Sequence, residues 1–224
     1  MLRALLFDFD GTIAQSEPLH FTAFCQTLAE RDVSLTQDLY DRRYLGLTDA
    51  ECLERMLDDF GRADLRAEVP ALLHRKAAIM AQKITAGVPL CPGVRSFVAR
   101  AARRVALAIV SGARREEIDR VLEHAGLHPF FPLVVGAEEI ERGKPDPEGY
   151  RLACTRLRDR VAGLSPDQCL AVEDSPRGIA AAHAAGMRVI ALPHTCPVER
   201  LCDADRIYAS YDKVEWRDLE SLCR

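Results

Sequence analysis

The chain has 224 residues, of which 48% are hydrophobic and 29% are charged, and its formal net charge at pH 7 is −4. This length and apolar content suit one large or two modest domains with a buried core. The acidic balance argues against the basic stripe of a nucleic-acid-binding protein, so we expect no nucleic-acid partner.

Eight cysteines are scattered along the chain, and none forms a Cys-x-x-Cys pair or a Cys/His cluster with zinc-like spacing. We interpret them as free thiols in a reducing cytoplasm. The N-terminal stretch MLRALLFDFD meets its first acid at Asp8 and lacks the features of a signal peptide. No uninterrupted apolar run approaches the ~20 residues that a membrane-spanning helix needs. We therefore expect a cytoplasmic protein without a membrane partner.

Near-continuous apolar runs recur along the chain and predict strands buried on both faces of a parallel sheet. These runs lie at residues 2–9, 104–110, 132–136, 168–172 and 187–192. Helical patterns alternate with them at residues 114–125, 147–158 and 176–185. The alternation predicts an α/β fold, namely a doubly wound, Rossmann-like parallel sheet covered by helices.

Three residues are expected to mark helix boundaries. Gly126 follows the helix predicted over 114–125 and is expected to end it. Asp146 and Ser175 each precede a proline, and we expect both to cap the helix that follows.

Residues 15–85 interrupt this alternation with helical patterns and no strong strand pattern. Their apolar residues recur at helical spacing, as in Leu53, Met56, Leu57 and Phe60, in Val69, Leu72 and Leu73, and in Ile79, Met80 and Ile84. We predict a small helical cap domain over 15–85. It is inserted into an α/β core domain formed by 1–14 and 86–224.

Polar side chains follow three of the predicted strands, at the point where each strand ends. Ligands of open α/β sheets bind outside the carboxyl ends of the strands, so these groups are expected to share one crevice. They are Asp8 and Asp10 after the first strand, Ser111 and Gly112 after the second, and Glu173 and Asp174 after the fourth, with Lys144 in a loop before a helix.

Four carboxylates in one crevice repel one another and require a cation. Oxygen ligands suit Mg²⁺, which readily shares its coordination shell with phosphate oxygens. Ser111 and the backbone N–H groups of Gly112 and Ala113 suit an anion at a helix N-terminus, and Lys144 adds a positive charge. One carboxylate is then able to attack phosphorus while a second, two residues on, serves the leaving group. The pattern predicts phosphoryl transfer.

Four motifs together resemble the haloacid dehalogenase superfamily of aspartate-nucleophile phosphotransferases. They are FDFDGT at 7–12, the strand end at Ser111, GKPDP at 143–147 and EDSPRGI at 173–179. The resemblance is closest to the β-phosphoglucomutase-like branch, whose small helical cap is inserted after the first strand. It covers essentially the whole chain.

The resemblance implies a role for each acid. Asp8 is the nucleophile that becomes an aspartyl-phosphate, and Asp10 is the general acid for the leaving group and then the base for the attacking water. The Mg²⁺ ligands are the Asp8 side chain, the Asp10 backbone carbonyl and Asp174, with Glu173 close by or acting through water. Asp10 also argues against dehalogenation, which has no need of a second acid there.

The resemblance assigns the phosphoryl group to Ser111 and Lys144, and it favours a monomer. In the cap, Glu17 and His20 share a helix face and are expected either to meet the substrate or to position Asp10. His20 and Lys76 match a histidine and a lysine of the β-phosphoglucomutase-like pattern. The alternative is that His20 and Lys76 are structural or solvated side chains.

One cap loop departs from the mutase pattern. The mutase holds a distal phosphate with an arginine just after a glycine and a lysine just before it. Here the loop reads YLGLTD at 44–49, with Leu45 and Leu47 beside Gly46 and Asp49 close by. A second phosphate is expected to meet Asp49 rather than a guanidinium, which favours a phosphatase.

We therefore predict a Mg²⁺-dependent phosphatase of a small phosphorylated metabolite, with a sugar phosphate as the favoured class. The first alternative is a hexose-phosphate mutase of the β-phosphoglucomutase type. The others are another transfer on the same aspartyl chemistry and a non-catalytic module that binds phosphate.

Overall fold

Six strands form one parallel sheet in the order β3-β2-β1-β4-β5-β6. The computed structural model describes residues 1–223. The strands are β1 (Ala4–Phe7), β2 (Ala106–Val110), β3 (Leu133–Val135), β4 (Cys169–Glu173), β5 (Arg188–Ala191) and β6 (Arg206–Ile207). The doubly wound α/β fold is thus confirmed. The sequence missed β6, because two residues ending in one apolar side chain make no apolar run.

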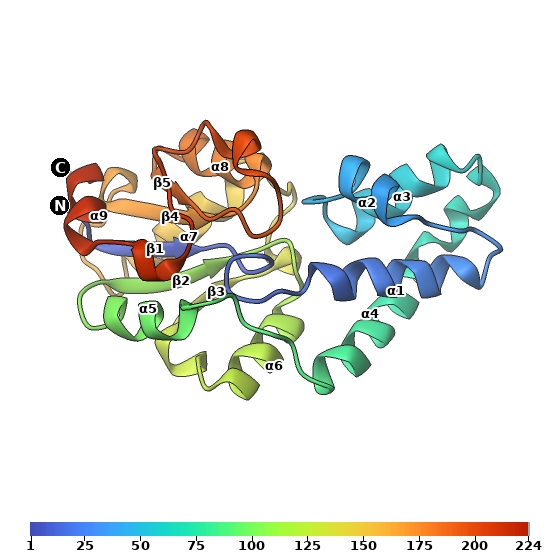
Figure 1. Cartoon of the computed structure of the whole chain (residues 1–224), viewed down its shortest axis with the longest axis horizontal. Coiled ribbons are helices and arrows are strands. Elements are labelled where there is room, and N and C mark those ends of the chain that lie inside the picture. Colours follow the sequence, from blue (N-terminus) through green and yellow to red (C-terminus); the bar gives the residue numbers. More distant parts are fainter. Residues whose placement is uncertain (224) are drawn as a thin grey trace.

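Helices cover both faces of the sheet, as Figure 1 shows. Leu5 and Phe7 of β1 face a core built with α5 (Val94–Ala101), α6 (Arg115–Ala125) and α9 (Trp216–Leu222). Ala4 and Leu6 face the opposite core, built with α7 (Glu148–Leu157) and α8 (Pro176–Ala184). Alternate residues of β1 are therefore buried in different cores, which explains its unbroken apolar run.

Short 3₁₀ helices occupy several connections. They are η1 (Ala63–Glu68), η2 (His128–Phe130), η3 (Ala137–Glu139), η4 (Pro166–Gln168), η5 (Val198–Leu201) and η6 (Tyr211–Lys213).

Two of the three predicted helix boundaries are confirmed. Gly126 ends α6 in the left-handed region at φ 65°, and the Ser175 hydroxyl accepts a hydrogen bond from the Gly178 N–H at 3.1 Å. The Asp146 prediction is shifted by one residue, because α7 begins at Glu148 after Pro147. The Asp146 carboxylate still accepts the Glu148 N–H at 3.0 Å, so it satisfies one free donor of the first turn.

Between Glu17 and Thr85, all of which the structure describes, the named elements are helical. They are α1 (Glu17–Ala29), α2 (Gln37–Arg43), α3 (Asp49–Asp59), η1 and α4 (Val69–Thr85). This group lies to one side of the sheet in Figure 1 and has its own apolar cluster, which includes Phe24, Leu53 and Met56. We call it the cap. The exact domain limits at residues 14 and 86 stay a prediction.

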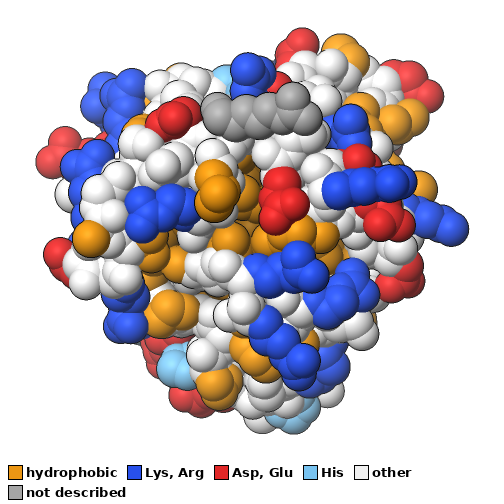
Figure 2. Space-filling model, turned by 90° about the vertical axis from the view of Figure 1, so that its left-hand side faces the viewer, with side chains coloured by type: hydrophobic (Ala, Val, Ile, Leu, Met, Phe, Trp, Pro, Cys, Tyr) orange, Lys and Arg blue, Asp and Glu red, His pale blue; other side chains and the backbone are white. Residues whose placement is uncertain are grey.

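The end of the molecule away from the cap carries mixed charges. Figure 2 shows basic, acidic and small apolar patches interspersed there, with both chain ends nearby in Figure 1. In the part of the chain that the structure describes, no helix is both long enough and apolar enough to cross a membrane. The eight cysteines are free thiols.

Replacing Phe7 by alanine tests the core that positions β1. Phe7 is fully buried and packs edge-on against Phe97 and Phe131, with ring centroids 6.0 and 5.6 Å away. We expect Phe7→Ala to lower the free energy of unfolding by about 3–5 kcal/mol, because it removes a buried ring and leaves a cavity. Urea denaturation measures this. Val198→Ala, at an exposed apolar side chain, is the control and should change stability by less than about 0.5 kcal/mol. A loss below about 1 kcal/mol for Phe7→Ala would contradict the packing.

Candidate active site

Three neighbouring strands bring the predicted acids and Ser111 to one edge of the sheet. β1 lies between β2 and β4, and Asp8, Ser111 and Asp174 are the first residues after these strands. The Asp8 N–H donates to the Val172 carbonyl at 2.9 Å, which extends the pairing one residue beyond β1. The strand order reverses between β1 and β4, and such a reversal opens a crevice at the carboxyl edge.

The structure places three carboxylates of the predicted set in one buried cluster. Each of Asp8, Glu173 and Asp174 offers an oxygen, and these oxygens all lie within 4.8 Å of one another. Burial raises the pKa of Asp8 to about 8, although the Lys144 ammonium opposes this shift. Burial, followed by the charges of Asp8 and Glu173, also raises the pKa of Asp174. Such a cluster is stable in its charged form only beside a cation, and its oxygen donors fit a hard divalent ion.

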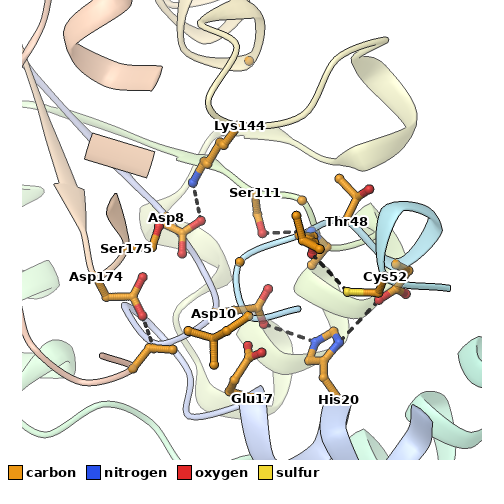
Figure 3. Close-up of a pocket in the computed structure, with 18 of the residues that line it drawn as sticks. Asp8, Asp10, Glu17, His20, Thr48, Cys52, Ser111, Lys144, Asp174 and Ser175 are labelled. Carbon is orange, nitrogen blue, oxygen red and sulfur yellow. Dashed lines mark hydrogen bonds and ion pairs between the residues drawn. The ribbon is translucent and has the colours of Figure 1, made fainter. Parts of the chain in front are cut away.

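Lys144 supplies one positive charge to this cluster. Its ammonium donates to Asp8 Oδ1 at 2.5 Å and to Glu173 Oε1 at 2.6 Å, as drawn in part in Figure 3. These two carboxylates raise the pKa of Lys144 even though burial lowers it. Glu173 also accepts the hydroxyls of Tyr150 at 2.6 Å and Ser175 at 3.2 Å. Glu173 therefore anchors Lys144 to the end of β4.

Gly11 allows the acid cluster to approach the chain directly after the second predicted acid, Asp10. Its φ is +72°, and a Cβ built on it would lie 1.8 Å from Asp174 Oδ2 and 1.9 Å from Thr195 Oγ1. The Thr195 hydroxyl donates to Asp174, and His194 Nδ1 lies 2.9 Å from the Gly11 carbonyl oxygen. The sequence reasoning missed Thr195. The signal that found the other residues could have found it, because it follows the apolar run at 187–192.

Ser111 lies at the end of β2 and is almost fully buried. Its hydroxyl accepts the Ala113 N–H at 3.0 Å. The sequence pattern predicted that this N–H faces an anion, whereas here it orients Ser111. Ser111, Gly112 and Ala113 all line the cavity that holds Asp8 and Asp10.

On the cap side, His20 links the core acid Asp10 to the cap. His20 Nε2 lies 3.5 Å from Asp10 Oδ1, which also accepts the Ser16 hydroxyl. Burial and the Lys76 ammonium lower the pKa of His20, but Asp10 and Asp49 outweigh them and raise it to about 10. His20 in turn lowers the pKa of Asp10 against the effect of burial. The two side chains therefore form an ion pair in which the proton stays on His20.

Lys76 lies behind His20 and is fully buried. Its ammonium donates to both Asp49 oxygens at 2.7 Å and lies 2.8 Å from His20 Nδ1. When Nδ1 carries no proton, it accepts this hydrogen bond from Lys76. When His20 is protonated, its Nδ1–H has Asp49 Oδ1, 3.7 Å away, as its partner. We therefore expect Lys76 to act through His20 and Asp49 rather than by touching a substrate.

Glu17 faces the same cavity from the first turn of α1. It accepts the Tyr40 hydroxyl at 2.7 Å, and burial raises its pKa. Figure 3 shows Glu17 beside Asp10 and His20, so the structure brings Glu17 and His20 to the acid site, whereas Lys76, predicted with them, does not line the cavity.

The cap touches the core directly above the cavity. Arg177 of α8 donates to Glu51 of α3 at 3.2 Å. A Cβ on Gly143 would lie 2.8 Å from the Thr48 methyl, so any larger residue there would require Thr48 to shift. The cavity is therefore lined by cap and core together, which separates a bound molecule from bulk water.

Comparison with known proteins adds a family. A family model described as haloacid dehalogenase-like hydrolase matches residues 5–192. The chain is 30% identical over 199 residues to a phosphorylated carbohydrates phosphatase from Thermotoga maritima, covering 87% of each chain. It is 28% identical over 203 residues to β-phosphoglucomutase from Bacillus subtilis, covering 88% of this chain and 86% of that one.

A solved structure shares the whole architecture. CbbY from Rhodobacter sphaeroides, in complex with xylulose 1,5-bisphosphate, superposes with a TM-score of 0.82 at 27% sequence identity. The match covers 95% of this chain and 96% of that one.

Replacing Gly11 by alanine tests the close approach at the acid cluster. We expect Gly11→Ala to abolish most activity of the site, because the new Cβ displaces the carboxylate of Asp174 and the hydroxyl of Thr195. The matched control is Gly61→Ala, where φ is +65° and nothing lies within 4 Å. This control carries only the backbone strain of about 1–2 kcal/mol and should keep its activity. Phosphate release and urea denaturation of both variants measure the two effects. Equal activity in both would contradict this account of Gly11.

Proposed function

The chain belongs to the haloacid dehalogenase-like hydrolases, and we propose that it hydrolyses a sugar phosphate in a Mg²⁺-dependent reaction through an aspartyl-phosphate. It is a phosphatase of the β-phosphoglucomutase-like branch. The observation that carries the proposal is the contact between Lys144 and Asp8. Asp174 lies close to Asp8, and Asp10 lines the same cavity.

Asp8 is the proposed nucleophile. Lys144 fixes the position of one of its oxygens and offsets the repulsion that a phosphate dianion would meet. One Asp8 oxygen forms the new bond to phosphorus while the bond from phosphorus to the sugar oxygen breaks. Ser111 and the backbone of Gly112 line the same cavity and are proposed to hold the phosphoryl oxygens together with Lys144.

Asp10 is the proposed acid and base. A proton passes from Asp10 to the departing sugar oxygen in the first step, and Asp10 takes a proton from the attacking water in the second. His20 lies 3.5 Å from this carboxylate, and against the effect of burial their pairing raises the pKa of His20 and lowers that of Asp10, so His20 is proposed to hold and orient Asp10 rather than to supply its proton. In this role His20 is a positioning residue that acts through Asp10.

The residues proposed to hold Mg²⁺ are the carboxylates of Asp8 and Asp174 and the backbone carbonyl of Asp10. Glu173 lies beside them and, through its contacts with Lys144 and Tyr150, is proposed to orient the cluster. A bound divalent ion supplies positive charge that lets a carboxylate and a phosphate come together.

The mutase named among the relatives is the second candidate. A mutase returns the phosphoryl group to a different oxygen of a bisphosphate, whereas a phosphatase passes it to water. An assay that follows both inorganic phosphate and the isomerised sugar phosphate separates the two reactions.

Asp8→Asn tests the nucleophile. We expect wild-type protein to release phosphate from sugar phosphates only when Mg²⁺ is present, and Asp8→Asn to lose activity on the order of 10³-fold or more, because an amide is not a competent nucleophile. A molybdate assay measures phosphate, and glucose 6-phosphate formed from β-glucose 1-phosphate is followed in parallel. Asp41→Asn, at an exposed cap acid, is the control. Isomerisation without phosphate release would replace the phosphatase by the mutase.

His20→Gln tests the positioning role. We expect kcat to fall by about 10²-fold with little change in KM, because His20 contacts the acid rather than the phosphoryl group. His183→Gln removes a histidine from a surface pair with Asp205 and should leave both constants unchanged. A rise in KM without a fall in kcat would mean that His20 binds the substrate instead.

A further inference from the structure

The cations near the cavity are each matched by carboxylates. Lys144 contacts Asp8 and Glu173, both within 2.6 Å. On the cap side, Lys76 is bound by both oxygens of Asp49, and His20 lies beside Asp10. The positive charges of the inner site therefore already have carboxylate partners, and the one assigned to a substrate group, Lys144, is assigned to the reacting phosphoryl group.

The remaining arginines at this site are paired as well. Arg142 lines the cavity and lies 3.1 Å from Asp146 and 3.8 Å from Glu148. Arg177 donates to Glu51 at 3.2 Å. Among the described residues that line the inner cavity, no guanidinium or ammonium lacks a carboxylate partner.

Apart from the ion-paired His20 and Asp49, the cap wall of the cavity is mainly apolar. Leu45 and Leu47 line it beside Gly46, and the aromatic rings of Phe24 and Tyr40 lie deeper. Beyond the paired network this wall adds Glu17, which accepts the Tyr40 hydroxyl and offers a second anionic group no positive charge in either protonation state. A second anionic group on a substrate would be held there against apolar surface and a carboxylate.

An outer groove continues the cavity between cap and core, sharing Thr48 and Gly112 with it. Its charged lining is mainly acidic, with Asp49, Glu51, Glu54, Glu138 and Glu141 against Arg114 and Arg142. Arg114 is itself 3.3 Å from Glu138. A leaving group that extends beyond the inner cavity therefore enters a negative electrostatic field.

We propose that this site selects monophosphates whose leaving group is uncharged or carries an amine, and that it discriminates against substrates with a second anionic group. The inference rests on the proposed phosphatase function and names its substrate class. Selectivity arises because the lining carries an excess of carboxylates and no cation without a carboxylate partner, so a second anionic group is repelled, a hydroxyl is tolerated and an ammonium is attracted.

This selectivity separates the chain from the solved relative with the same architecture. That CbbY structure holds a bisphosphate, xylulose 1,5-bisphosphate. The fold alone does not set this preference, because side chains that meet a leaving group can be exchanged without changing the helices that carry them.

The test compares four sugar phosphates that share one pyranose ring and one reacting phosphate. They are glucose 1-phosphate, glucosamine 1-phosphate, glucuronate 1-phosphate and glucose 1,6-bisphosphate. We expect kcat/KM for the neutral and amino sugars to exceed that for both anionic sugars by about tenfold or more. Dissociation constants of the same compounds with Asp8→Asn, measured calorimetrically with Mg²⁺, should follow the same order.

The two readouts separate the two proposals. Ranked binding by Asp8→Asn with no turnover by wild-type protein would remove the phosphatase and keep the selectivity. Equal or tighter binding of glucose 1,6-bisphosphate or glucuronate 1-phosphate would overturn the selectivity, whatever the turnover. If none of the four compounds binds at millimolar concentration, the selectivity proposal is also wrong, because it predicts binding of glucose 1-phosphate and glucosamine 1-phosphate.

Two charge-neutralising variants locate the selectivity. Asp49→Asn leaves the Lys76 charge without its partner and should improve binding of the bisphosphate relative to glucose 1-phosphate. Glu141→Gln changes an exposed acid of the outer groove and is expected to fold normally. It should also improve binding of the bisphosphate relative to glucose 1-phosphate, by a smaller factor than Asp49→Asn. Asp41 lines neither the inner cavity nor the outer groove, so Asp41→Asn should leave the relative affinity for the bisphosphate and glucose 1-phosphate unchanged. If neither Asp49→Asn nor Glu141→Gln changes this relative affinity, then Asp49 and Glu141 do not determine the selectivity.

Discussion

The site depends on one buried ammonium, that of Lys144, held between two carboxylates at the ends of neighbouring strands. β1 delivers Asp8 and β4 delivers Glu173, and hydrogen bonding between these strands fixes both at the same edge. Removing charges from water is costly, and the cost is offset only when each charge finds close partners of the opposite sign. The loop that carries Lys144 is therefore tied to the sheet by the same contacts that prepare Asp8 for chemistry.

The cap repeats this arrangement with a second buried ammonium. Lys76 binds Asp49 and lies against His20, and His20 reaches the core through Asp10. A chain of charged groups thus runs from the cap helices to the carboxylate proposed to move the proton. Because His20 lies on a cap helix and Asp10 in the core, the position of the cap relative to the core sets the distance between these two side chains.

Local sequence signals predicted most of the sheet and several helix ends. The apolar runs located five strands because each strand is buried on one or both faces. Ser175 caps α8 and Gly126 ends α6 as predicted, because both depend on residues close by in the sequence. β6 was not predicted because a strand of two residues has no recognisable apolar run. Thr195 escaped because its partner, Asp174, lies far from it in sequence, and hydroxyl residues in loops are common.

The sequence by itself determined which chemical groups are available: two acids after the first strand, an acid pair after the fourth, and a lysine before a helix. Their positions at strand ends follow from the parallel topology, so their meeting at one edge was predictable. Only the tertiary structure decided how their charges are paired. Asp49 stood in the sequence as an acid in place of a mutase cation, yet in the fold it binds Lys76. Electrostatic energy depends on the distance between charges, and that distance is set by packing of segments that the sequence keeps apart.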